Sequence, residues 1–403
     1  MSSPMLNIED KPAFDNRIAL FRLGFRPFFL GGAAFTAAAM LYWMGILAIG
    51  WPFQLGEISP ATWHAHEMIF GYSLAVIAGF LLTAVMNWTG VQTLNGRPLA
   101  ALFILWVAAR LLPLAWADLP LVLYAVIDCL FALLLFAAVL HPVVKSRQRK
   151  QISVVTKIFL LLLSNILFYL GALGIVDDGE RMGLYSGLYL VLALILLLAR
   201  RVIPFFIEKG VGYPVQLKNR RWLDLTSLAL FTLLWISDAF LDNVTATGWL
   251  AGALLVLHVV RLVGWHTPGI WKKPLLWVLY IAYLWIVFGF ALKFALLFTD
   301  ISPSLAVHAF TVGGIGMMTV GMMARVSLGH TGRNVFEPPK ILGWLFALIL
   351  VASVVRVIIP LLTTQHYLLW IGISQFLWIA VFCLFFYIYF PILLRQRVDG
   401  RDG

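Results

Sequence analysis

Apolar runs of about 20 residues recur along the whole chain, and short polar connections separate them. A helix of that length crosses the hydrocarbon core of a bilayer, so each run predicts one membrane-spanning helix. No run shows the alternating pattern and turn signals of a membrane β-barrel. The pattern therefore predicts an all-α polytopic membrane protein with about twelve transmembrane helices, at residues 28–50, 61–86, 98–118, 120–141, 152–176, 182–207, 222–241, 245–266, 273–298, 302–328, 340–363 and 366–394.

The predicted spans leave little of the chain outside a membrane. Hydrophobic residues make up 62% of it and charged residues 12%, whereas soluble proteins carry about twice that charged fraction. The polar stretch before the first span lacks the small-residue cleavage site of a secretory signal. We therefore expect a single transmembrane domain over residues 1–403, with a short N-terminal segment 1–27, helices over 28–394 and a tail 395–403.

Charge alternates between successive connections. Basic residues gather at both ends of the chain and in every second connection, and acidic residues dominate the others, with Glu57, Asp118, Asp177, Asp178, Glu180, Asp242 and Asp300. The positive-inside rule then places both termini in the cytoplasm. The net charge of +11 follows from this topology, so it gives no reason to expect nucleic acid as a partner; the expected surroundings are membrane lipid.

Histidines stand near the start of two spans. The run Trp63-His64-Ala65-His66-Glu67-Met68 opens the second predicted span, and His308 lies near the start of the tenth. Histidine and carboxylate are costly in hydrocarbon and persist there mainly where they bind or react. Two imidazoles at matching depth suit a haem or copper centre. Because Cys129 and Cys383 form no Cys-x-x-Cys-His motif, axial ligands alone would hold any haem.

The two histidine-bearing segments resemble each other, although chance similarity between apolar helices is an open alternative. Both predicted helices run from the outer face inward, with each histidine about five residues inside, so the two share one depth. We therefore predict that His66 and His308 ligate one b-type haem near the outer face. Adding 242 takes His66 to His308, Gly71 to Gly313, Gly79 to Gly321, and Thr89-Gly90 to Thr331-Gly332.

The separation of eight helices between the two histidines fits three units of four helices each. Haem-copper oxidase subunits are built in this way, so the likeness is one of architecture alone.

His64 and His66 are two residues apart, so on an α-helix they point about 200° apart and cannot chelate one ion. Glu67 and Met68 fall on the His64 side, at i+3 and i+4. We expect His64 to serve a second centre, either copper or the metal that faces the substrate, with Glu67 as proton donor. The alternative is an interfacial cluster wetted by the outer surface.

Buried cations point to the same outer region. Arg110, Lys293 and Arg356 fall in the outer half of their predicted spans, where haem propionates would need them as partners. A structural pair between Lys293 and Asp238 is the alternative. At the cytoplasmic end of the tenth span, His330 is a candidate ligand for a quinone or a second metal, or a polar helix cap.

Several long stretches resemble the NnrS family of bacterial membrane proteins. They include the run from Leu20 to Phe29, the run from Trp63 to Met68, Gly79 to Gly90, Arg201 to Phe206, Pro274 to Leu279, and the segment from His308 to Gly313 leading to Leu328-Gly329-His330-Thr331-Gly332-Arg333. In one departure from the family pattern, Tyr280 follows Leu279 where a histidine is common.

The resemblance implies a twelve-helix protein of the bacterial inner membrane that contains haem and copper and responds to nitric oxide and nitrosative stress. It implies a metal role for His64, His66, His308 and His330. The resemblance leaves open whether such a protein is an enzyme, a carrier or an assembly factor.

Three functions follow as hypotheses. The first is a membrane oxidoreductase that reduces nitric oxide in denitrification or stress defence, with haem b, copper and quinol as the electron donor. The second is a carrier or sensor that binds haem, metal or nitric oxide without turnover. The third, a secondary transporter, is less favoured because the internal similarity does not relate two halves of six helices. The sequence names no protein partner.

Overall fold

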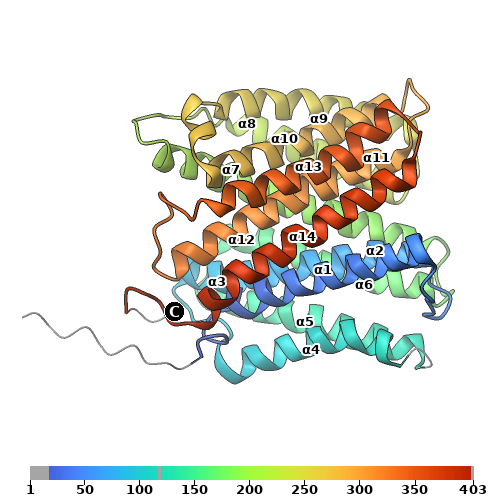
Figure 1. Cartoon of the computed structure of the whole chain (residues 1–403), viewed down its shortest axis with the longest axis horizontal. Coiled ribbons are helices and arrows are strands. Elements are labelled where there is room, and N and C mark those ends of the chain that lie inside the picture. The colour runs from blue at the N-terminus through green and yellow to red at the C-terminus, as the bar shows by residue number, and fades with distance from the viewer. Residues whose placement is uncertain (1–17, 117–118, 401–403) are drawn as a thin grey trace, which may run out of the picture.

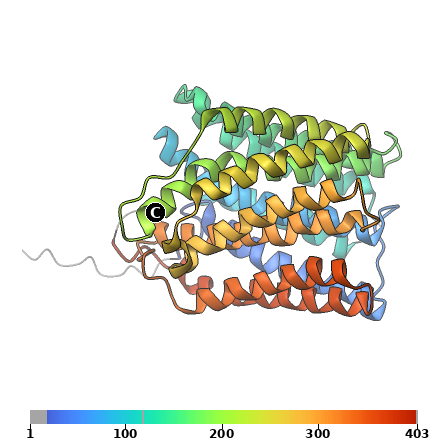
Figure 2. The same ribbon diagram turned by 90° about the horizontal axis from the view of Figure 1, so that it is seen from above.

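The computed structural model describes residues 18–116 and 119–400, and its helices run side by side along the long axis of the molecule (Figures 1 and 2). Every regular element among these residues is helical. In chain order they are α1 (Phe25–Ile49), α2 (Pro60–His66), η1 (Glu67–Ser73), α3 (Leu74–Thr89), α4 (Gly96–Ala115), α5 (Leu121–Lys145), η2 (Arg149–Gln151), α6 (Ile152–Ala172), α7 (Gly179–Gly210), α8 (Arg221–Ala239), α9 (Val244–Trp265), η3 (Pro268–Lys272), α10 (Pro274–Ala295), α11 (Pro303–His308), η4 (Ala309–Gly316), α12 (Met317–His330), α13 (Ile341–Leu362) and α14 (Tyr367–Leu394).

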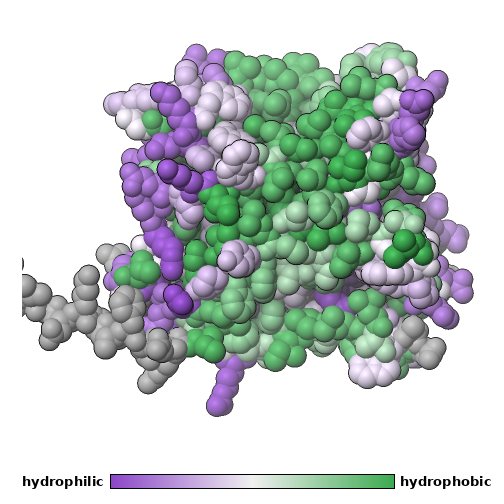
Figure 3. Space-filling model, viewed as in Figure 1, coloured by the Kyte–Doolittle hydropathy of each residue, from purple (hydrophilic) through white to green (hydrophobic). Residues whose placement is uncertain are grey.

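Within the described residues, twelve helical segments are long and apolar enough to cross a membrane. They match the predicted spans one for one, which confirms the expected fold class. Apolar side chains form a broad band between two more hydrophilic ends of the molecule (Figure 3). The grouping into three four-helix units stays a prediction.

The two histidine-bearing spans lie at the centre of the bundle. Within an apolar stretch of 18 residues in each span, 78% is buried for Pro60–Thr89 and for Pro303–His330, compared with 33% for the peripheral span Gly96–Ala115. Tyr72 and Thr319 join the two central spans directly through a hydrogen bond of 2.7 Å between their hydroxyls. Residues at the start of both spans are therefore positioned by packing on several sides.

Both central spans change from α-helix to π-helix directly after the aligned histidines. Glu67–Ser73 follows His66, and Ala309–Gly316 follows His308. Hydroxyls next to these turns bond to backbone carbonyls: Ser73 Oγ donates to Met68 O at 2.7 Å. The internal similarity seen in the sequence thus extends to the backbone. Single π-turns inside α-helices occur frequently at functional sites.

Small residues let other elements approach the π-turns. A Cβ at Gly313 would lie 2.4 Å from the Trp285 ring, and one at Gly71 would lie 2.6 Å from Glu67 Oε2. Glycine therefore provides at both positions the space that a neighbouring side chain needs.

The two ends of the described chain meet at one end of the bundle. Ala19 N donates to Leu394 O at 2.8 Å, and Arg26 Nη1 donates to Leu393 O at 2.8 Å and Arg395 O at 2.7 Å. An even number of spans requires this placement. That this end faces the cytoplasm stays a prediction from the charge pattern.

The topology predicts that reporter fusions after Lys150, in η2, and Asp178, just before α7, lie on opposite sides of the membrane, because only α6 separates them. A phosphatase fusion should be active after Asp178 and inactive after Lys150, while a fluorescent protein that folds only in the cytoplasm should show the opposite pattern. Activity of one reporter at both positions would overturn the assignment of α6 as a span.

Candidate functional site

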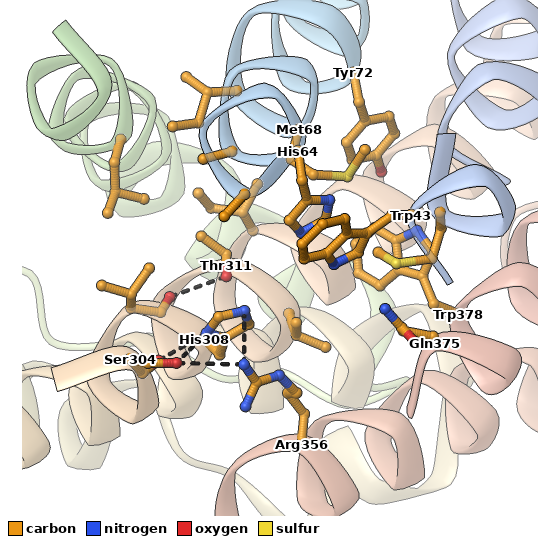
Figure 4. Close-up of a pocket in the computed structure, with 18 of the residues that line it drawn as sticks. Trp43, His64, Met68, Tyr72, Ser304, His308, Thr311, Arg356, Gln375 and Trp378 are labelled. Atoms are coloured by element: carbon orange, nitrogen blue, oxygen red, sulfur yellow. Dashed lines mark hydrogen bonds between the residues drawn. The ribbon is translucent and has the colours of Figure 1, made fainter. Parts of the chain in front are cut away.

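A cavity of about 540 Å³ lies at the end of the bundle opposite to the chain termini, within the size range of cofactor sites. Its wall comes from α1, α2, η1, α7, α11, η4, α13 and α14. Most of this wall is apolar. The polar or metal-binding side chains in it include His64, Met68, Tyr72, Ser304, His308, Thr311, Arg356 and Gln375 (Figure 4).

His64 reaches the cavity from α2, one helical turn before Met68. Its ring stacks on the indole of Trp43, with centroids 5.0 Å apart and an angle of 9° between the planes. Its Nδ1 atom is buried and has no hydrogen-bond partner among the described residues. Buried polar atoms are nearly always paired, so this one points to an interaction with a ligand.

His308 reaches the same cavity from α11, and its hydrogen bonds define its tautomer. Nδ1 lies 2.7 Å from the Ser304 carbonyl oxygen, which only accepts, so Nδ1 carries the proton. Nε2 then has a lone pair and accepts a hydrogen bond from Arg356 Nη2 at 3.1 Å (Figure 4). A histidine that donates its Nδ1 proton to a backbone carbonyl and offers Nε2 is the usual arrangement of a metal ligand.

Arg356 and Gln375 add unpaired donors to this cavity. Arg356 Nη1 and Gln375 Nε2 are buried without hydrogen-bond partners in the described part of the chain. Together with His64 Nδ1, they give three unsatisfied polar atoms in one cavity. A ligand that fits must therefore offer acceptors as well as an apolar body.

His66 does not share this cavity with His308, which corrects the predicted haem ligation by that pair. Its Nδ1 lies 3.2 Å from Glu67 Oε1 and its Nε2 lies 2.9 Å from Asn165 Oδ1. Both ring nitrogens are therefore occupied within the protein. The ring stacks on Phe168, with centroids 4.4 Å apart. His64 and His66 do point to different sides of the helix, but His64 is the one that faces His308.

A buried ionic network surrounds His66. Arg110 Nη1 donates to Glu67 Oε2 at 2.6 Å, and its Nη2 donates to Asp128. Asp128 Oδ2 also accepts from Asn165 Nδ2 at 2.9 Å and Tyr169 OH at 3.2 Å. The guanidinium of Arg110 thus pairs with two carboxylates of the protein, and it does not line the cavity as the expected propionate partner would.

Glu67 does not lie beside His64 as the proton donor that the sequence predicted. It bonds to His66 and Arg110 and does not line the cavity, whereas Met68 does. The α-helical spacing that put Glu67 on the His64 face ends at Glu67, because the wider π-turn begins there.

Lys293 forms the structural ion pair with Asp238 that the sequence offered as the alternative to a propionate partner. Its Nζ lies 2.6 Å from Asp238 Oδ2, and that same oxygen accepts a hydrogen bond of 2.5 Å from Tyr189 OH. Lys293 lies behind the cavity wall, over the ring of Tyr185 at 5.4 Å. Of the three cations expected to hold propionates, only Arg356 lines the cavity.

His330 ends α12 at the opposite end of the span from His308. Its ring packs against Phe25, with centroids 5.7 Å apart, and its carbonyl accepts from Arg397 Nη1 at 3.0 Å. It therefore lies outside the cavity. Tyr280, which stands where a histidine is common in the family, does not line the cavity either, and its hydroxyl donates to Leu262 O at 3.0 Å.

Sequence reasoning missed Ser304, Gln375, Asn165 and Tyr169, which are neutral side chains without a motif. Ser304 could have been identified from the sequence, since it lies one helical turn before His308, and its carbonyl faces that ring. Gln375 is on the last span, where no motif drew attention to it. His258, a further histidine within a span, lies in α9, and its Nδ1 is 2.6 Å from the Tyr283 hydroxyl.

These observations define a multi-pass helical membrane protein with a buried, histidine-lined cavity near one face of its bundle. The chain belongs to the NnrS family, because the family model described as NnrS protein matches residues 19–397. No curated protein matches the chain in a sequence search. Membership of this family ties the protein to the nitric oxide response.

The network predicts that Arg110→Leu destabilises the protein by about 3–5 kcal/mol, since it leaves two buried carboxylates without their cation. The loss should appear as a lower unfolding temperature of the purified protein in detergent. The double variant Arg110→Leu with Asp128→Leu removes one of these carboxylates and should recover part of the loss. An unchanged unfolding temperature for the single variant would contradict the network.

Proposed function

We propose that this protein binds a b-type haem in the cavity and acts there on nitric oxide. The observation that carries the proposal is the geometry of His308, whose Nδ1 donates to Ser304 O, so that the lone pair of Nε2, which here accepts from Arg356 inside the cavity, is the one a metal would use. The chemistry of the lining fits the group, because a haem combines an apolar ring with two carboxylates and the cavity combines apolar walls with Arg356 and Gln375.

Each side chain has a distinct part in the proposal. His308 would hold the haem, with its ring oriented by the Ser304 carbonyl. His64 and Met68 lie one turn apart on the same side of the helix, and imidazole with thioether suits copper, which we assign to them. Trp43 fixes the ring of His64 by stacking. When bound, a haem supplies the iron that holds nitric oxide and exchanges electrons with it.

The proposed reaction joins two nitric oxide molecules with two protons and two electrons to give nitrous oxide and water. Nitric oxide is small and uncharged, so it dissolves in hydrocarbon and needs no polar tunnel. Quinol is the proposed donor, since it carries electrons within the membrane. The proposed location is the bacterial inner membrane with both termini cytoplasmic, which places the cavity near the outer face.

The second candidate is a carrier or sensor that binds haem and nitric oxide without turnover. It is favoured by one observation: none of the described side chains that line the cavity is a carboxylate. Glu67, the expected proton donor, bonds to His66 and Arg110 instead. Under this candidate the same histidines bind the ligand, but no group adjoining the cavity delivers protons for a reduction.

Single substitutions of the three histidines test the haem site. His308→Ala should abolish the Soret band of protein purified from haem-replete cells, because it removes the side chain that would hold the haem. His64→Ala should keep the band and lose copper, measured by metal analysis. His66→Asn is the matched control, since that ring lies outside the cavity, and its band should stay. Loss of the band in His66→Asn with retention in His308→Ala would reverse the assignment.

Anaerobic consumption of nitric oxide separates enzyme from carrier. The enzyme proposal predicts continued consumption by protein in liposomes when a quinol is added, with one nitrous oxide formed for every two nitric oxide molecules. The carrier proposal predicts a burst of about one nitric oxide per bound haem and then none. A protein without any Soret band would rule out both.

A further inference from the structure

Arg356 differs in its partners from three other cations buried in the spans. Arg110, Arg261 and Lys293 each form an ion pair with a carboxylate, at N–O distances of 2.6 to 2.8 Å for the pairs with Glu67, Asp224 and Asp238. No carboxylate within the described residues forms an ion pair with Arg356. Lys157 and Arg325 also form no ion pair with a carboxylate of the described residues, but unlike Arg356 they do not line the cavity. A cation without a counter-charge is costly in a low-dielectric interior, so an anion near it would be strongly stabilised.

The hydrogen bonds that Arg356 does make are to neutral groups. Its Nη2 donates to His308 Nε2 at 3.1 Å and to Ser304 Oγ at 3.3 Å. Its Nη1 is buried and has no hydrogen-bond partner in the described part of the chain. Gln375 Nε2 is a second unpaired donor in the same cavity.

The bond to His308 uses the nitrogen on which metal coordination depends. Because Nδ1 carries the proton, Nε2 has the only available lone pair of the ring. That lone pair either accepts the hydrogen bond from Arg356 or binds a metal, but not both. A metal at His308 therefore requires the guanidinium to move to another acceptor, and Figure 4 shows it beside the ring, facing the cavity.

We propose that Arg356 is a specificity-determining residue, which admits a metal to His308 only as part of an anionic complex. A bare cation would take the lone pair and leave two positive charges close together with no counter-charge. A metal porphyrin brings carboxylates that accept the hydrogen bonds of Arg356 as it leaves Nε2. This inference rests on the proposed function, because it concerns the ligand of the same cavity.

The decisive comparison uses protein purified without haem and two probes, haem b and its dimethyl ester, which lacks the two negative charges. The native protein should bind haem b about 10- to 100-fold more tightly than the ester, the worth of a charge-assisted hydrogen bond. Arg356→Gln should bind both with similar affinity, and Arg356→Lys should keep part of the preference. Equal affinities in the native protein would overturn the proposal.

Bare Co²⁺ tests the competition for Nε2 without any haem. Arg356→Gln should bind it at least about 10-fold more tightly than the native protein, because a competing hydrogen bond and a like charge are both removed. The matched control is Arg181→Gln, whose guanidinium bonds to Asp238 O at 2.9 Å and lies outside the cavity lining. It should bind Co²⁺ as the native protein does.

The comparison of haem with its ester and the Co²⁺ measurement together distinguish a failure of this inference from a failure of the proposed function. If the native protein binds neither haem nor its ester, the proposed haem site fails, and the Co²⁺ arm still reports on the competition. If haem binds well but Arg356→Gln changes neither the ester preference nor the Co²⁺ affinity, then Arg356 does not select the ligand and only this inference fails.

Discussion

The packing of the helices in this protein depends on pairing the charged side chains within the spans, because an unpaired charge in hydrocarbon is costly. Each buried ionic group around His66 has its partner: Arg110 joins Glu67 and Asp128, and Asn165 completes the contacts of the ring. Lys293 and Asp238 satisfy each other in the same way. These pairs fix the relative rotation of neighbouring helices, because each charge has one position in which it is neutralised.

Single buried polar atoms without a partner occur elsewhere among the described residues, for example Arg110 Nε and His258 Nε2. The cavity brings three of them together. His64, Arg356 and Gln375 each have a buried nitrogen without a partner, and all three line one space between helices. The contrast with the network of Arg110, Glu67 and Asp128, whose charges pair with one another, separates structural polarity from polarity directed at a ligand. It also explains why two histidines only two residues apart have different roles.

The sequence predicted the spans well and the site only in part. Length and hydropathy decide where a helix crosses a membrane, so every span was found. Which histidine faces which neighbour depends on helix rotation, and the π-turn that begins at Glu67 changes that rotation. No residue pattern announces such a turn. His66 was therefore paired with His308, although Asn165 and Glu67 occupy its ring nitrogens.

The bond between Arg26 and the end of α14 has a consequence for biogenesis. Arg26 is fully buried near the start of the first span, and it donates to the carbonyls of Leu393 and Arg395 at the end of the last one. During synthesis these carbonyls leave the ribosome only after every other span has been made. These two contacts between the first helix and the last therefore form only after α14 has been made, and a chain that stops before α14 lacks both of these acceptors.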